Sequence, residues 1–139
     1  MTPKAALKHY FGYTEFKAGQ KKVIDLLLEH KNTLALLPTG GGKSLCYQIP
    51  ALLEDGLTLV ISPLISLMKD QVDSLQQNGI PAAFINSSQE FETAKAVLTR
   101  ARRHELKLLY IAPERLENQF FLELLQTLPV SLVAVDEAH

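Results

Sequence analysis

The sequence predicts an α/β fold in three layers, a parallel β-sheet with helices on both faces. Short apolar runs alternate along the chain with longer amphipathic stretches. The apolar runs lack strict alternation of apolar and polar residues, which is typical of strands buried on both faces. Strand–helix–strand repetition with short connections favours parallel strands joined by right-handed crossovers. The predicted strands are Thr33–Leu37, Leu57–Ile61, Ala82–Ile85, Leu106–Ile111 and Ser131–Val135.

Helices are predicted in the stretches between these strands. Residues Ile65–Gln77 carry apolar side chains at helical spacing. Ser62–Pro63 is a suitable entry to this helix, because proline presets the first-turn dihedral and serine can cap. Asn78–Gly79 supplies its exit. A further helix is predicted from about Glu117 to Leu128.

Two other helices carry local signals. One is predicted to open at Ser87 with a capping box, in which Glu90 is the acidic partner, and to run to about His104. Another should follow Ser44, but Pro50 falls inside it. Because proline removes a backbone donor, we expect Pro50 to kink or end that helix.

Composition limits the class of protein. The chain has 139 residues, the size of one globular domain, and is 47% hydrophobic, so it can form a core. Its formal net charge of −1 excludes a strongly basic nucleic-acid-binding sleeve but not a local patch. The single cysteine, Cys46, excludes an internal disulfide and a multi-cysteine zinc site. No signal-peptide core and no membrane-spanning apolar run is visible, so we expect a soluble, cytoplasmic protein.

A phosphate-binding loop is predicted directly after the first strand, where Pro38–Ser44 opens a helix. Consecutive glycines let several backbone N–H groups point at one polyphosphate, and the helix N-terminus favours negative charge. Lys43 adds a positive charge between the outer phosphates, and the Ser44 hydroxyl is placed to ligate Mg²⁺. The strict pattern has glycine where this chain has Leu37, and the alternative is a glycine-rich turn with an incidental lysine. The predicted nucleotide-binding residues of the loop are Thr39, Gly40, Gly41, Gly42, Lys43 and Ser44.

Two adjacent carboxylates, Asp136 and Glu137, follow the last predicted strand. In open parallel sheets the ligand crevice lies outside the carboxyl ends of the strands, so this pair and the phosphate loop should open on the same side. Asp136 can hold Mg²⁺, and Glu137 can orient and deprotonate the water that attacks the outer phosphorus. Taken alone, such a pair is usually a solvated turn, and the phosphate loop in the same chain favours the catalytic interpretation.

PTGGGKS at residues 38–44, together with DEAH at residues 136–139, resembles superfamily 2 helicases. Longer strings narrow the resemblance to RecQ-type DNA helicases, in that family's order and over nearly the whole chain. These strings are FGYTEFKAGQ (Phe11–Gln20), PTGGGKSLCYQIPAL (Pro38–Leu52), SPLISLMKDQV (Ser62–Val72), INSS (Ile85–Ser88) and YIAPERL (Tyr110–Leu116). The resemblance implies the ATP-binding lobe of a 3′–5′ DNA helicase, which hydrolyses ATP with Mg²⁺ and serves repair and recombination.

The resemblance also implies an adenine site. Tyr13 would stack on the base, and Gln20 would offer it one donor and one acceptor. Lys17 stands where the family usually has arginine, and lysine lacks the planar fork of a guanidinium. From the residues alone, Phe11, Tyr13 and Phe16 are most simply an aromatic cluster that anchors the N-terminal segment to the core.

Residues just after the strands resemble the family's contacts to the DNA backbone. They are Ser62, Pro63, Leu64, Asn86, Ser87, Pro113, Glu114 and Arg115. Hydroxyls, amides and backbone N–H groups suit phosphate contacts that ignore sequence, and the alternative for the serines is capping and turn formation. The resemblance gives His139 the role of coupling hydrolysis to these contacts. The five lysines and one glutamate of residues 1–22 give a local charge of +4 that suits steering of nucleic acid.

We expect the chain to be part of a larger protein or a truncated gene product. By resemblance it comprises an adenine-recognition segment (residues 1–22) and a partial RecA-like ATP-binding domain (residues 23–139), incomplete at its C-terminal end, without a second lobe or zinc region. A sheet that lacks the strand beside the one ending at Asp136 should leave unpaired backbone groups and an uncovered apolar surface.

The expected partner is single-stranded or partly duplex DNA, in the bacterial cytoplasm or nucleoid, with no membrane. Zinc is possible only in regions that this chain lacks. The alternatives are a non-catalytic nucleotide-binding or interaction fragment and an RNA helicase of the same superfamily.

Overall fold

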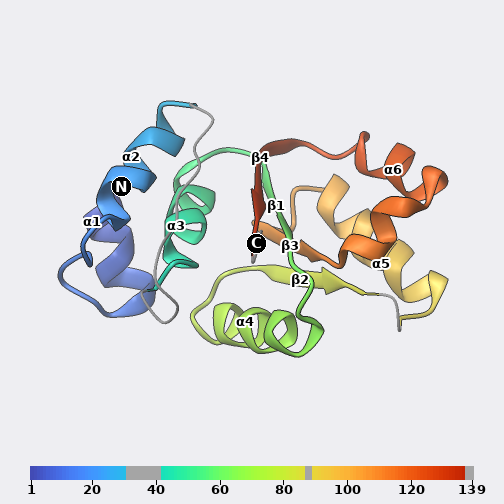
Figure 1. Ribbon diagram of the computed structural model, residues 1–139, viewed down its shortest axis with the longest axis horizontal. Coiled ribbons are helices and arrows are strands. Elements are labelled where there is room, and N and C mark those ends of the chain that lie inside the picture. The colour runs from blue at the N-terminus through green and yellow to red at the C-terminus, as the bar shows by residue number, and fades with distance from the viewer. Residues whose placement is uncertain (31–41, 87–88, 137–139) are drawn as a thin grey trace. The chain divides into compact units, whose positions relative to one another are not determined.

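The computed structural model describes residues 1–30, 42–86 and 89–136 (Figure 1). Its contacts divide the chain into two compact units, an N-terminal unit of residues 1–55 and a C-terminal unit of residues 56–139. The predicted strand at Thr33–Leu37 lies outside the described residues, and the predicted functional boundary after residue 22 stays a prediction. Within the described ranges, no helix is both long and apolar enough to cross a membrane.

The described part of the N-terminal unit is helical. Thr2 caps the first helix, where its hydroxyl accepts the Ala5 N–H at 3.1 Å. The helices pack around a small core formed by Ala6, Leu7, Ile24 and Ile49. The elements are α1 (Pro3–Ala6), the π-helical turn η1 (Leu7–Phe11), α2 (Gln20–Leu28) and α3 (Leu45–Leu53).

Pro50 does not end the helix in which it lies. α3 continues to Leu53, and the Pro50 carbonyl accepts the Glu54 N–H at 3.0 Å. Of the two expected effects of Pro50, a kink or an end of the helix, the end is therefore wrong. Every residue from Cys46 to Ala51 is buried, so packing of the helix offsets the one backbone bond that proline cannot make.

The C-terminal unit is a parallel sheet with its strands in the order β2-β3-β1-β4. All three strand pairs are parallel, which confirms the predicted α/β class. The elements are β1 (Leu57–Ile61), α4 (Ile65–Gln77), β2 (Ala82–Ile85), α5 (Phe91–Arg102), β3 (Leu108–Ile111), the 3-10 turn η2 (Pro113–Glu117), α6 (Gln119–Leu125) and β4 (Val130–Val135).

Helices cover both faces of this sheet, as predicted. α5 and α6 share one core with the sheet residues Leu59, Ile85 and Ile111. α4 buries Met68, Val72 and Leu75 and contacts β2, and in Figure 1 it lies on the opposite side of β2 from α5 and α6. The sequence therefore predicted the layers of this unit because its strands are apolar on both faces and its helices on one.

The observed helix bounds agree best with the predicted bounds where apolar residues clearly repeat at helical spacing. α4 has the predicted range, with Gly79 at φ +81° after its end. Its N-cap is Leu64 without a side-chain capping bond, so capping by Ser62 is wrong. The Ser62 N–H instead donates to the Ile111 carbonyl at 3.1 Å and extends the β1–β3 ladder by one rung.

α5 begins at Phe91, later than the predicted start. Glu90 is its N-cap and makes no side-chain capping bond, so the predicted helix start at Ser87 is wrong, and the Ser87 side chain lies outside the described residues. The physical reason is Gln89, whose Oε1 accepts the Asn86 N–H at 3.1 Å. Asn86 and Gln89 are thus bonded to each other outside the helix, and α5 starts after both residues.

The last helix is shorter than the predicted Glu117–Leu128. The 3-10 turn η2 comes first, and α6 then starts at Asn118 as N-cap, where the Asn118 Oδ1 accepts the Phe121 N–H at 3.0 Å. A side-chain acceptor at the N-cap satisfies one of the unpaired N–H groups of a helix start. The cap at Asn118 therefore decides where the helix begins.

β4 lies at an edge of the described sheet, where it pairs with β1. Val133 and Val135 of this strand are 57% and 61% exposed. Leu59 and Ile61, their register partners in β1, face the core shared with α5 and α6. The described part of the sheet thus exposes apolar side chains at β4, and the predicted absence of a neighbouring strand stays a prediction.

A buried hydroxyl in β1 allows a test of the packing. Thr58 is 0% exposed, and within the described residues its Oγ1 has no hydrogen-bond partner. An unsatisfied buried hydroxyl costs about 1–3 kcal/mol, and valine has the same shape without it. We expect Thr58→Val to raise the free energy of unfolding by about 1 kcal/mol in urea denaturation.

Thr127→Val is the matched control for this substitution. Thr127 Oγ1 donates to the Leu124 carbonyl at 2.6 Å and accepts from Arg102 Nε at 3.1 Å. Because these bonds are lost, we expect Thr127→Val to lower stability by about 0.5–1.5 kcal/mol. A lower free energy of unfolding for Thr58→Val would contradict the assignment of Thr58 as an unpaired hydroxyl.

Candidate functional site

Gly42 links Gln20 to the start of α3. Its φ is +73°, and a Cβ on this residue would lie 2.5 Å from Gln20 Nε2. The Gly42 carbonyl accepts from Gln20 Nε2 at 2.9 Å and from the Leu45 N–H at 3.1 Å. Positive φ costs a side-chain-bearing residue about 1–2 kcal/mol, and a side chain would also displace Gln20. Both the backbone and its neighbour therefore require glycine.

The N-terminus of α3 follows Gly42 directly. Ser44 is the N-cap of this nine-residue helix, and its side chain makes no capping hydrogen bond. N–H groups and the dipole at a helix start favour an anion. The ammonium of Lys43 suits phosphate oxygens, and a hydroxyl oxygen suits Mg²⁺. This donor set fits a polyphosphate with Mg²⁺ on the residues that the structure describes.

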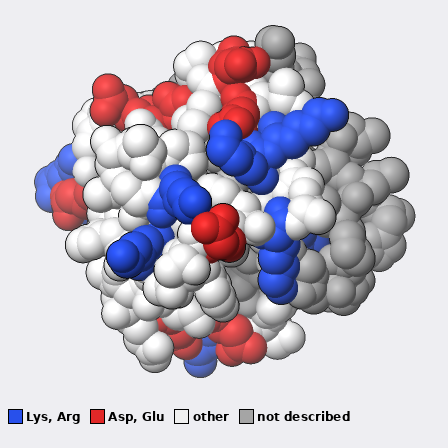
Figure 2. Space-filling model, turned by 90° about the vertical axis from the view of Figure 1, so that its left-hand side faces the viewer, with Lys and Arg blue, Asp and Glu red and all other residues white. Residues whose placement is uncertain are grey.

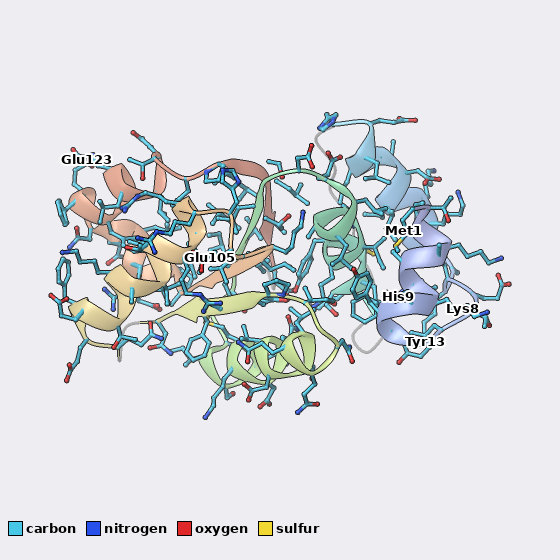
Figure 3. The ribbon with its side chains drawn as sticks, turned by 180° about the vertical axis from the view of Figure 1, so that it is seen from behind. Met1, Lys8, His9, Tyr13, Glu105 and Glu123 are labelled. Carbon is cyan, nitrogen blue, oxygen red and sulfur yellow. The ribbon has the colours of Figure 1, made fainter. Side chains whose placement is uncertain are left out.

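The three predicted adenine residues have different environments. Gln20 is 2% exposed, and its Oε1 accepts the Lys17 N–H at 2.7 Å. The Lys17 side chain is exposed. Tyr13 is 59% exposed and lies at the surface (Figure 3). Gln20 thus joins the predicted adenine-recognition segment to Gly42 of the predicted phosphate loop, a connection that sequence spacing did not predict.

The aromatic residues near Tyr13 have separate roles. Phe11 and Phe16 are half-buried and pack against the core of the N-terminal unit. The interpretation as an anchoring aromatic cluster is therefore right for these two residues. It is wrong for Tyr13, which is exposed, and an exposed phenol ring is available for stacking.

The carboxyl edge of the sheet gathers residues from four predicted motifs. The last register row consists of Ile85, Ile111, Ile61 and Val135. Each next residue of β3, β1 and β4 donates its N–H to the last carbonyl of the neighbouring strand. These bonds are Ala112 to Ile85 at 3.0 Å, Ser62 to Ile111 at 3.1 Å and Asp136 to Ile61 at 2.8 Å. The backbone therefore holds all four strand ends in one row.

Exposure differs among the residues at this edge. Ser62, Asn86 and Asp136 are 2%, 4% and 7% exposed. The more accessible predicted DNA contacts are Pro63, Leu64 and Glu114, with Pro113 and Arg115 half-buried. Asp136 is thus a buried carboxylate at the carboxyl end of β4, the place predicted for a magnesium ligand.

A polar network ties the loop after β2 to the loop after β3. The Arg115 guanidinium donates to the Asn86 carbonyl from Nε at 3.0 Å and from Nη2 at 2.8 Å. Nη2 also donates to the Gln89 carbonyl at 3.0 Å. Sequence reasoning missed Gln89, although a glutamine between a strand end and a helix start is a candidate for bonds to the strand backbone.

Some predicted site residues lie outside the described residues, and their roles stay predictions. They are Thr39, Gly40, Gly41, Ser87, Glu137 and His139.

Figure 2 shows lysines and arginines interspersed with carboxylates on the face that carries α1 and α2. Lys4 pairs with Glu15 at 3.1 Å, and Lys21 pairs with Asp25 at 2.7 Å. Such exposed pairs contribute little to stability, but they reduce the local positive charge. Ion pairing therefore weakens the steering field that the lysines of residues 1–22 alone would produce.

Cys46 is a buried free thiol in α3. Desolvation by burial raises its pKa from 9.0 to about 11, so the thiol stays protonated at neutral pH. This confirms the interpretation of Cys46 as a small buried residue.

Comparison with known proteins identifies the family. The family model described as DEAD/DEAH box helicase matches residues 17–139. The chain is 53% identical over 137 residues to the ATP-dependent DNA helicase RecQ of Bacillus subtilis, covering 98% of this chain and 23% of that protein. It is 55% identical over 129 residues to RecQ of Pasteurella multocida, covering 93% of this chain and 20% of that protein.

A solved structure agrees on the fold. The DUF1998 helicase MrfA bound to DNA matches with a TM-score of 0.75 at 19% identity, over 94% of this chain and 20% of that chain. The fold is therefore that of a RecA-like helicase lobe, and the predicted resemblance to RecQ-type helicases is confirmed. The chain spans about a fifth of the length of the RecQ relatives named above. On this evidence the chain belongs to the DEAD/DEAH box helicase family.

Proposed function

We propose that this chain is the ATP-binding part of a RecQ-type DNA helicase that hydrolyses ATP to drive 3′–5′ unwinding in repair and recombination. The relatives at 53% and 55% identity are named as ATP-dependent DNA helicases. The observation that carries the proposal is the Gly42 network, because it joins the predicted adenine residue Gln20 to Lys43 and Ser44 at a helix start.

Each residue of the nucleotide site receives a role from its chemistry. Lys43 and the N–H groups at the start of α3 bind the outer phosphates, and Tyr13 stacks on the base. Ser44 and Asp136 are the proposed ligands of Mg²⁺, which would neutralise charge on the phosphate oxygens. Glu137 orients the attacking water and takes its proton. Thr39, Gly40 and Gly41 complete the phosphate loop.

Gln20 has two proposed tasks. Its amide carries a donor and an acceptor for the edge of adenine, and binding of the base would require the amide to exchange the bonds that it makes to Gly42 and Lys17. The same amide donates to the Gly42 carbonyl, so engagement of the base affects the backbone of the phosphate loop. Base recognition and phosphate binding are coupled through this one side chain, with Lys17 held beside it through the 2.7 Å bond from its N–H.

DNA is proposed to cross the carboxyl edge of the C-terminal unit. The exposed residues Pro63, Leu64 and Glu114 and the half-buried Pro113 follow β1 and β3 at this edge. Contacts to the DNA backbone from such loops position a strand without reading its sequence. His139 lies two residues after Glu137 in the chain and is proposed to couple hydrolysis to DNA contact. The intact protein would act in the bacterial cytoplasm or nucleoid.

ATP hydrolysis by the intact protein tests this function. We expect single-stranded DNA to stimulate hydrolysis several-fold more than RNA of the same length and composition, because the relatives are named as DNA helicases. The measurement is phosphate release at saturating ATP and Mg²⁺. Absence of hydrolysis with DNA would favour a non-catalytic nucleotide-binding protein, and stronger stimulation by RNA would favour an RNA helicase.

Substitutions in the intact protein separate binding from turnover. We expect Lys43→Ala to weaken ATP binding about 10–100-fold, the loss expected for hydrogen bonds to a charged group. Glu137→Gln should retain ATP affinity and lower kcat about 10²–10⁴-fold, the contribution of a general base. Equilibrium binding and single-turnover hydrolysis measure the two effects. Lys69→Ala, at an exposed position of α4, is the control and should change neither binding nor turnover. Activity of Glu137→Gln equal to wild type would refute the role of Glu137 as general base.

The coupling role of Gln20 has its own test. We expect Gln20→Ala to weaken ATP binding about tenfold and to reduce the preference for ATP over GTP, because the bonds to the base and to Gly42 are lost together. Gln76→Ala is the matched control, since Gln76 Nε2 also donates to a backbone carbonyl, that of Ala82, at 2.9 Å. Equal ATP affinity for both variants would contradict the proposed task of Gln20.

A further inference from the structure

The Arg115 side chain lies between two loops and an aromatic ring. Arg115 itself belongs to η2, after β3, and its guanidinium reaches the carbonyls of Asn86 and Gln89, which follow β2 in the chain. Its Cζ lies 5.9 Å from the centroid of the Phe121 ring in α6. Three separate segments of the C-terminal unit therefore meet at this one side chain.

The donor geometry limits what else Arg115 can bind. Nη2 has two hydrogens, and they are directed at two carbonyl oxygens, those of Asn86 at 2.8 Å and Gln89 at 3.0 Å. A guanidinium binds phosphate or carboxylate through two parallel N–H bonds, given either by Nε and Nη2 or by Nη1 and Nη2. Both pairs of donors include Nη2. The Nε hydrogen is also used, at 3.0 Å from the Asn86 carbonyl. The fork is therefore engaged within the protein.

Gln89 completes the connection from the other side. Its Oε1 accepts the Asn86 N–H at 3.1 Å, and its Nε2 donates to the Phe84 carbonyl at 3.1 Å. Asn86 is 4% exposed. Its N–H donates to Gln89, and its carbonyl accepts from Arg115, so both of its backbone groups are held by side chains. The Ala112 N–H, bonded to Ile85 at 3.0 Å, joins the same two loops one residue earlier.

We propose that Arg115 is a positioning residue, which fixes Asn86 and the Pro113–Glu114 turn relative to each other and does not bind DNA phosphate itself. The role in DNA binding rests on the proposed function of these loops. This assignment differs from the direct DNA contact that the resemblance implies for Arg115. In this role the guanidinium fixes the shape of the proposed interface through its bonds to backbone carbonyls, and it makes no direct contact with a phosphate group.

The salt dependence of DNA binding distinguishes the two roles. Arg115→Lys keeps the positive charge and removes the fork, and affinity is measured with a fluorescent single-stranded oligonucleotide and the intact protein across a salt series. We expect affinity to fall about tenfold with an unchanged slope of log K against log salt. If Arg115 contacted phosphate, Arg115→Gln would reduce the slope by about 0.7, whereas a positioning role leaves the slope of Arg115→Gln at the wild-type value. A reduced slope for Arg115→Gln would overturn the proposal.

Hydrogen exchange supplies a readout that does not depend on DNA. In Arg115→Lys we expect faster exchange at the amides of Asn86 and Ala112, while the amides of α4 keep the wild-type rates. Arg103→Lys is the matched control, because Arg103 is exposed after the end of α5, and it should change neither exchange nor affinity. Wild-type exchange at Asn86 in Arg115→Lys would overturn the proposal.

Gln89→Leu is the second variant, for the case that Arg115→Lys unfolds. It removes both Gln89 side-chain bonds and leaves every charge in place. We expect the same loss of DNA affinity with an unchanged salt slope, and a wild-type affinity would count against the proposal. If the wild-type protein binds no DNA, the proposed function fails, whereas exchange at Asn86 still decides whether Arg115 positions the loop.

Discussion

The common register of four parallel strands is the constraint on which the C-terminal unit depends. Parallel strands end at the same edge of a sheet, so the residue after each strand enters one row. Here the backbone extends this row by one rung, because Ala112, Ser62 and Asp136 each donate an N–H to the neighbouring strand. A buried carboxylate and three loops are thereby held at fixed separations by main-chain bonds, which are less adjustable than side-chain contacts.

Two side chains add further hydrogen bonds to the loops at this edge of the sheet. Arg115 and Gln89 hold the loops after β3 and β2 through backbone carbonyls and N–H groups. Bonds from a charged donor are among the stronger hydrogen bonds in proteins. An interface that binds nucleic acid without reading sequence needs a defined shape as well as positive charge, and in the proposed DNA interface this network would supply the shape.

In the N-terminal unit, one glycine has a comparable effect. Gly42 places its carbonyl where Gln20 and Leu45 both donate to it, and no side chain fits at this position. A residue from the start of α2 therefore contacts the loop that begins α3, across 22 positions of sequence. In the proposed ATP site this contact lets the base-binding residues and the phosphate-binding residues respond to each other.

Predictions from sequence succeeded where a repeating pattern carries the information. The range of α4, the parallel strands and the layers follow from apolar periodicity, which reflects the burial of whole elements. They failed at positions decided by a single contact. Gln89 delays the start of α5, and burial around Pro50 lets α3 continue to Leu53. Such contacts depend on which neighbours the fold supplies, and local propensity does not include those neighbours.

The amino-acid sequence by itself determined the α/β class, the family and the chemistry of the candidate residues, because glycines, a lysine, a serine and a carboxylate at set places in the chain have few other uses together. Only the tertiary structure decided that Gln20 bonds to Gly42, that Tyr13 is exposed while Phe11 and Phe16 pack inward, and that the Arg115 fork faces backbone carbonyls. The physical reason is that hydrogen bonding and burial depend on distances between residues far apart in the chain, and these distances exist only after the elements have packed.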